Sequence, residues 1–83
     1  YEKGNFISPT ILEGLPLDGE LIKTEIFGPV MTLVHMKNVD DAIDFINRGT
    51  YGNMACLFTT SGNSARKFRS EAMAGNIGIN IGI

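Results

Sequence analysis

The stretch "VMTLVHMKNVDDAIDFINRG", residues 30–49, decides the fold because its hydrophobic period changes partway along. Residues 30–36 form a nearly unbroken run of β-branched and apolar side chains, which predicts a strand. Apolar residues then recur with the spacing of one face of an amphipathic helix: Val39, Ala42, Ile43 and Ile46. Asn38 is a suitable N-cap and Gly49 a suitable end, so we expect a strand followed by a helix.

The same order of elements is repeated downstream. The segment "MACLFTT", residues 54–60, predicts a second strand that is apolar on both faces. A second helix is expected from an N-cap at Asn63 to an end at Gly75. Four of its residues should point inward: Ala65, Phe68, Ala72 and Met73. The alternating tail "NIGINIGI", residues 76–83, predicts a third strand with Ile77, Ile79, Ile81 and Ile83 on one face.

These elements define an α/β fold, in which a βαβαβ portion with parallel strands and crossover helices follows an extended N-terminal segment. The extended segment is 5–12, and its Pro9 favours an edge strand or a bulge. Residues 13–20 are expected to form a loop, and 21–26 a short helical turn. Both helices should cover the same face of the sheet. The apolar second strand therefore requires another layer, from the rest of a larger protein or from another copy.

Composition limits the classes of function. The chain has 83 residues, 43% hydrophobic and 19% charged, with a net charge of −2. This balance gives no general attraction to nucleic acid or to an anionic membrane, and no apolar run is long enough to cross a bilayer. One cysteine excludes an internal disulfide framework and favours a reducing compartment, the cytoplasm or, in a eukaryote, the mitochondrial matrix. Since the chain begins without Met and stops within an alternating run, we expect a fragment.

Five motifs in order resemble the later part of the catalytic domain of the NAD(P)-dependent aldehyde dehydrogenase superfamily. They are "GNFISPTIL" (4–12), "EIFGPV" (25–30), "DDAIDFINRGTYG" (40–52), "FTTSGNSARKF" (58–68) and "AGNIGIN" (74–80). They span almost the whole chain, so the resemblance implies that residues 1–83 are a single, incomplete segment of that domain. Because Gly78 stands where most relatives carry a bulky residue, the tail is most similar to the acylating branch of methylmalonate-semialdehyde dehydrogenases.

The resemblance implies a specific chemistry. Such enzymes attack an aldehyde with a cysteine thiolate, transfer hydride to NAD and release the acyl group from a thioester. In the acylating branch the acceptor is coenzyme A, so methylmalonate semialdehyde yields propionyl-CoA. Glu25 matches the family glutamate that accepts hydrogen bonds from the nicotinamide ribose, and Phe27 matches the aromatic residue beside the nicotinamide ring. The family's nucleophile, in a Gly-Gln-x-Cys context, is absent, so no catalytic residue is assigned and the chain alone should be inactive.

The remaining chemistry-bearing residues favour structural roles. Cys56 lies within an apolar strand, where a thiol is a poor nucleophile. His35 is the only histidine and lacks further ligands at metal-binding spacing, so no metal site is expected. The basic cluster is expected to form a solvated face: Arg66, Lys67 and Arg69. Three acidic residues are expected to complement the helix dipole: Asp40, Asp41 and Asp44.

Two other interpretations stay open. Water could replace coenzyme A as the acyl acceptor, which would make the parent a hydrolytic aldehyde dehydrogenase. Alternatively, the chain could be a small stand-alone α/β interaction module that self-associates through a bare sheet face. In the enzyme interpretation the partner is a small-molecule aldehyde, and a homo-oligomer is expected through the rest of the enzyme or through the exposed sheet face.

Overall fold

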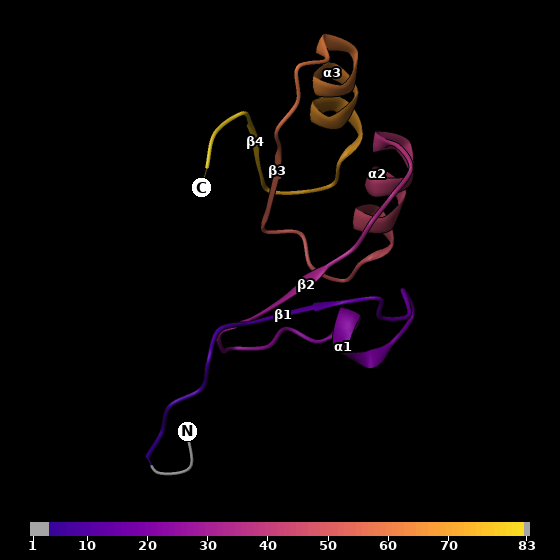
Figure 1. Ribbon diagram of the computed structural model, residues 1–83. Helices are drawn as coiled ribbons and strands as arrows, with labels where there is room; N and C mark the ends of the chain where they lie inside the picture. Colours follow the sequence, from indigo (N-terminus) through magenta and orange to yellow (C-terminus); the bar gives the residue numbers. More distant parts are fainter. Residues whose placement is uncertain (1–3, 83) are drawn as a thin grey trace. The chain divides into compact units, whose positions relative to one another are not determined.

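The computed structural model describes residues 4–82, which fall into two compact units, 4–35 and 36–82. The elements in chain order are β1 (Thr10–Glu13), α1 (Glu20–Lys23), β2 (Val30–Leu33), α2 (Val39–Arg48), β3 (Met54–Leu57), α3 (Gly62–Glu71) and β4 (Asn76–Ile79) (Figure 1). The alternation of strands and helices and the parallel pairing within each unit confirm the predicted α/β class.

The first unit is built on a parallel pair of strands, β1 and β2, in the register Thr10↔Val30 to Glu13↔Leu33. The pair opens with a hydrogen bond of 2.8 Å from Thr10 N to Pro29 O. None of the described residues of this unit is buried, and the side chains of β2 alternate between half-buried and exposed. Part of the predicted extended segment 5–12 forms a strand, β1, which begins directly after Pro9.

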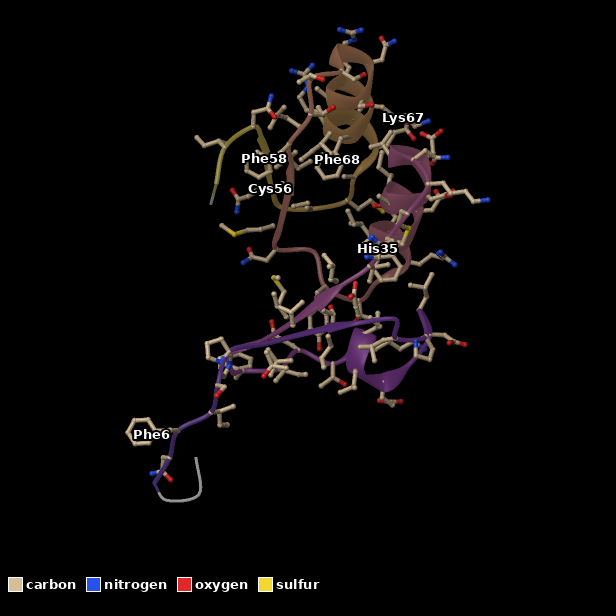
Figure 2. All side chains as sticks on the ribbon, in the orientation of Figure 1. Phe6, His35, Cys56, Phe58, Lys67 and Phe68 are labelled. Carbon is tan, nitrogen blue, oxygen red and sulfur yellow. The ribbon has the colours of Figure 1, made fainter. Side chains whose placement is uncertain are left out.

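The second unit pairs β3 with β4, also in parallel, in the register Met54↔Asn76 to Leu57↔Ile79. Helices α2 and α3 lie on the same side of this pair, as the sequence predicts (Figure 1). The buried core consists of Ile43, Phe68 and Ala72. Partly buried apolar side chains from α2 and from both strands pack against it: Val39, Ile46, Ala55, Leu57, Ile77 and Ile79. Figure 2 shows the Phe68 ring of α3 near β3.

The strand pairing differs from the single parallel sheet expected from residue 30 onward. Within residues 4–82, β2 pairs with β1, and the β3–β4 pair forms a second two-stranded sheet. The extended segment 10–13 supplies the hydrogen-bonding partner of β2. Parallel pairing joins residues about 20 apart along the chain, and no local pattern specifies which strand takes that place.

Helix α2 follows the sequence prediction closely. The Asn38 side chain accepts a hydrogen bond of 2.9 Å from Asp41 N, and Gly49 N closes the helix on Ile46 O at 3.1 Å. The predicted apolar stripe is the face that packs against the rest of the unit, because Ile43 is buried and the other residues of the stripe are half-buried. Local capping and periodicity are therefore sufficient to specify this helix.

Helix α3 corrects three sequence predictions. Its N-cap is Ser61, whose hydroxyl accepts a hydrogen bond of 3.2 Å from Ser64 N, so the prediction of Asn63 as the cap is wrong. The helix ends at Glu71, because the Ala72 backbone is already extended there, four residues before Gly75. Met73 consequently leaves the helical face and is 70% exposed.

Strand β4 is shorter than the alternation of "NIGINIGI" predicts. It ends at Ile79, because the next residue, Asn80, adopts a left-handed backbone with φ of 58°. Ile81 therefore leaves the isoleucine face and is 59% exposed, and the prediction for Ile83 lies outside the described residues. Gly78 is buried, and a Cβ there would lie 3.2 Å from Cys56 Sγ, so the absence of a side chain allows the two strands to approach closely at this position.

Candidate functional site

The candidate site is the bend that joins α1 to β2 in the first unit. Two tight backbone turns follow one another there: Gly28 N donates to Ile26 O at 3.0 Å, and Val30 N donates to Gly28 O at 2.8 Å. Each hydrogen bond spans two residues, the pattern of a γ-turn, and the first turn is centred on Phe27. The hydrogen bond from Thr10 N to Pro29 O attaches the end of the bend to β1.

Glu25 and Phe27 both project into solvent from this bend. The Phe27 side chain is 93% exposed, the highest fraction among the large apolar residues described. Glu25 is also exposed, and within residues 4–82 no hydrogen-bond or ion-pair partner occupies its carboxylate. An unpaired carboxylate can accept from two neighbouring hydroxyls, and an exposed aromatic face can pack against a flat ring. The bend therefore presents both groups that the sequence assigns to a cofactor, two positions apart.

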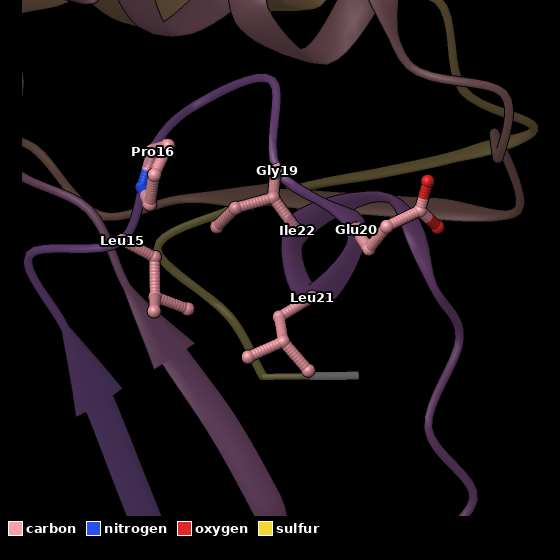
Figure 3. Close-up of a pocket in the computed structure, with 6 residues that line it drawn as sticks. All are labelled: Leu15, Pro16, Gly19, Glu20, Leu21 and Ile22. Atoms are coloured by element: carbon pink, nitrogen blue, oxygen red, sulfur yellow. The ribbon is translucent and has the colours of Figure 1, made fainter.

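A small pocket lies beside α1 in the same unit (Figure 3). It encloses about 140 Å³ and is lined by Leu15, Pro16, Gly19, Glu20, Leu21 and Ile22. The Glu20 carboxylate points away from Leu15 and Pro16, which leaves an apolar lining (Figure 3). Neither Glu25 nor Phe27 contributes to this pocket, so it is distinct from the candidate site.

His35 is paired with a carboxylate rather than clustered with further ligands. Its Nε2 lies 3.1 Å from Glu13 Oε2, and the two side chains are 78% and 63% exposed. Such an exposed pair contributes little to stability. Among the residues that the structure describes, no three His, Cys, Asp or Glu side chains come close enough to hold a metal ion.

Cys56 and one residue of the basic cluster Arg66, Lys67 and Arg69 take structural positions in the second unit. Cys56 is half-buried in β3 (Figure 2). Lys67 of that cluster lies 2.8 Å from Asp40 Oδ1 and 3.7 Å from Glu71 Oε2. The hydrogen bond and the charge of Asp40, followed by the charge of Glu71, raise the pKa of Lys67. Lys67 therefore connects α3 to the first turn of α2, and it is not a free cation.

Two asparagines have roles that the sequence patterns do not reveal. Asn47 Nδ2 donates to Glu71 O at 2.9 Å, and Asn47 Oδ1 accepts from Met73 N at 2.8 Å. Asn80 makes the corresponding pair of bonds with the backbone of Thr59. The sequence offers one local signal for each: Asn47 stands beside the apolar stripe of its helix, and Asn80 interrupts the Ile-Gly run.

Comparison with known proteins identifies the family to which this chain belongs. The chain belongs to the aldehyde dehydrogenase family, whose sequence pattern matches residues 1–83. It is 54% identical over 81 residues to "Methylmalonate-semialdehyde dehydrogenase [acylating], mitochondrial" of Arabidopsis thaliana, covering 98% of this chain and 13% of that protein. It is 42% identical over 80 residues to "Malonate-semialdehyde dehydrogenase" of Halalkalibacterium halodurans, covering 96% of this chain and 16% of that protein.

A solved structure agrees with these similarities. A Sinorhizobium meliloti protein assigned as a methylmalonate-semialdehyde dehydrogenase, solved in complex with NAD, superposes with a TM-score of 0.80 at 34% identity. The match covers 86% of this chain and 14% of that protein. The predicted resemblance to the family and to methylmalonate-semialdehyde dehydrogenases is thereby confirmed. The chain spans about one sixth or less of the length of these relatives. Within the described residues, no helix is long and apolar enough to cross a membrane.

Proposed function

We propose that this chain is a segment of the catalytic domain of an NAD-dependent, acylating aldehyde dehydrogenase, and that it contributes Glu25 and Phe27 to the nicotinamide site. Membership of the aldehyde dehydrogenase family supports an oxidoreductase that acts on aldehydes. The observation that carries the role of this segment is the bend before β2, from which an unpaired carboxylate and a 93% exposed ring project.

These two side chains suit the cofactor in their chemistry. NAD, when bound, accepts a hydride from the substrate. The Glu25 carboxylate has two oxygens with which to accept hydrogen bonds from the vicinal hydroxyls of the nicotinamide ribose. The Phe27 ring limits the positions that the flat nicotinamide can take and keeps water from one side of it. The first γ-turn holds the backbone at Phe27, directly after Ile26, so less conformational freedom of the ring is lost on binding.

The names of the relatives support a proposal for the substrate and the acyl acceptor. The Arabidopsis relative is named as an acylating methylmalonate-semialdehyde dehydrogenase, and the bacterial relative as a malonate-semialdehyde dehydrogenase. We propose methylmalonate semialdehyde as the aldehyde and coenzyme A as the acceptor, with propionyl-CoA as the product. In this scheme the nucleophilic cysteine belongs to another part of the enzyme, since Cys56 is half-buried in a strand. The mitochondrial name of the Arabidopsis relative supports a matrix location in a eukaryote.

The test is made in the full-length protein that carries this segment. Glu25→Gln keeps the shape of the side chain and removes its charge, and Phe27→Leu removes the aromatic face. We expect Glu25→Gln to raise the KM for NAD by about tenfold, since a hydrogen bond to a charged group contributes about 1.5–3 kcal/mol. Phe27→Leu should raise it by a few-fold, since an aromatic contact contributes about 0.5–1.5 kcal/mol. The matched control is Glu20→Gln, which makes the same change on the exposed surface of α1.

The expected pattern is specific to the cofactor. The KM for the aldehyde and the thermal unfolding temperature should stay close to those of the wild-type protein. The proposed role is wrong if Glu25→Gln and Glu20→Gln have equal kinetics with NAD. The choice of coenzyme A over water is tested separately, by measuring whether product formation gives a thioester when coenzyme A is supplied.

A further inference from the structure

The end of β4 is set by backbone conformation rather than by sequence pattern. Alternating apolar residues continue from Ile77 to Ile81, so the pattern alone would extend the strand. Asn80 interrupts it with φ of 58°, the one positive φ at a non-glycine residue among residues 4–82. A left-handed asparagine costs less than most other side chains but still requires a compensating interaction.

That interaction is a continuation of the strand ladder through the Asn80 side chain. Asn80 N donates to Leu57 O at 2.8 Å, which is the last regular bond between the two strands. Beyond it, Asn80 Oδ1 accepts from Thr59 N at 2.8 Å, and Asn80 Nδ2 donates to Thr59 O at 3.1 Å. A side-chain amide offers the same donor and acceptor as a peptide group. The amide therefore replaces the backbone that turned away at Asn80.

The Thr59 backbone is in turn connected to the start of α3. Ser61 N donates to Thr59 Oγ1 at 3.0 Å, and the Ser61 hydroxyl caps the helix by accepting from Ser64 N. A sequence of side-chain to backbone hydrogen bonds thus runs from the end of β4, through the turn 58–61, to the first turn of the helix.

The same turn directs the chain back across β4. Ile81 lies over Gly78, since a Cβ at Gly78 would be 3.1 Å from Ile81 Cγ2 and 3.3 Å from Ile81 O. Gly78 is buried for this reason, although it lies on the face opposite the helices. The path of the chain after β4 therefore depends on the left-handed residue that precedes Ile81.

We propose that Asn80 is a conformational latch, which holds the turn 58–61 against the end of β4 and sets the direction in which the chain leaves that strand. The inference does not depend on the proposed dehydrogenase activity. The position of Asn80 in the fold matters, because the latch joins the carboxyl ends of two parallel strands. This is the edge at which α/β sheets bind ligands.

The test is hydrogen exchange of backbone amides in the full-length protein, read at Thr59. Asn80→Gly keeps the left-handed backbone accessible and removes the side-chain amide. Asn80→Asp keeps an acceptor for Thr59 N, and it replaces the donor by a charged oxygen that cannot donate to Thr59 O. Asn76→Ala is the matched control, since Asn76 is exposed on the same strand and its side chain has no partner among the described residues.

We expect the change in hydrogen exchange to be confined to Thr59 and to differ in size between the variants. Exchange at Thr59 should be about tenfold faster in Asn80→Gly, the factor that corresponds to one hydrogen bond, and within about threefold of wild type in Asn80→Asp. Asn76→Ala should leave it unchanged. Exchange at Ala72, which is bonded to Phe68 in the core, reports global unfolding and should not change in any variant.

Three results would overturn the proposal. The first is an unchanged rate at Thr59 in Asn80→Gly, and the second is an equal acceleration at Thr59 and Ala72, which would mean general destabilisation. The third is a tenfold acceleration in Asn80→Asp, which retains the acceptor. Should Asn80→Gly not fold, the rate at Thr59 in Asn80→Asp decides the question: a rate within about threefold of wild type supports the proposal, and a tenfold acceleration overturns it.

Discussion

Gly78 offers the sharpest test of the packing between β3 and β4, through the substitution Gly78→Ala. An added Cβ would lie 3.1 Å from Ile81 Cγ2, 3.2 Å from Cys56 Sγ and 3.3 Å from Ile81 O. All three distances are shorter than an ordinary van der Waals contact between such atoms, about 3.5–4.0 Å. One of the three partners is a backbone oxygen, which cannot move without moving the turn that follows β4.

Two opposing effects determine the magnitude. Overpacking a filled site costs about 1–3 kcal/mol. Replacing glycine by alanine where φ is negative stabilises by about 0.4–1 kcal/mol, because the unfolded chain loses conformational freedom. We therefore expect Gly78→Ala to lower the free energy of unfolding by about 1–2 kcal/mol. Gly82→Ala is the matched control, since a Cβ there meets no atom within 4 Å, and it should be neutral or slightly stabilising.

The assay is urea denaturation followed by circular dichroism, at concentrations where sedimentation shows a single species. A second arm adds Ile81→Ala, which removes the closest of the three contacts. The double variant Gly78→Ala/Ile81→Ala should then lose less stability than the two single changes together, with a coupling of at least about 0.5 kcal/mol. Equal midpoints for Gly78→Ala and Gly82→Ala, at equal slopes, would refute the packing argument.

Three further predictions concern the second unit. Ser61→Ala should lower the free energy of unfolding by about 1 kcal/mol in urea denaturation, whereas Asn63→Ala, which alters the residue first expected to be the cap, should cost clearly less. Asp40 raises the pKa of Lys67, so charged Lys67 should make the free energy of unfolding larger in the wild type than in Lys67→Met. This difference should be full below about pH 10 and should shrink as the pH rises through the raised pKa. A difference that grows in alkali would contradict this. The isolated chain should self-associate, because Met54 of β3 and Phe58, directly after that strand, are 52% and 67% exposed; a monomer in sedimentation that unfolds cooperatively would contradict the expectation.

The success of the sequence in predicting α2 and its failure at the start of α3 have the same origin. For α2, one good cap, Asn38, stands directly before an apolar stripe, and both signals are local. Before α3, Ser61 and Asn63 are both good cap residues, and local chemistry does not choose between them. The hydrogen bond from Ser61 N to Thr59 Oγ1 favours Ser61, and Thr59 is itself held by Asn80, which lies 21 residues further along the chain.

The candidate site was predictable to a similar extent. Glu25 and Phe27 are two positions apart, so a motif in the sequence places them on one bend without any knowledge of the fold. Their exposure and the unpaired state of the Glu25 carboxylate depend on what the rest of the unit leaves uncovered. The Asn47 and Asn80 contacts were not predictable, since their partners lie 21–26 residues away.

The sequence by itself determined the order and type of the elements, the family and the position of the acid and the ring before β2. These follow from periodicity, capping and short motifs, which act over a few residues. Only the tertiary structure decided that β1 pairs with β2, that β4 ends at a left-handed Asn80, and that Gly78 is buried beneath Ile81. Each of these depends on groups that meet only after the chain has folded back on itself, so no local pattern carries the information.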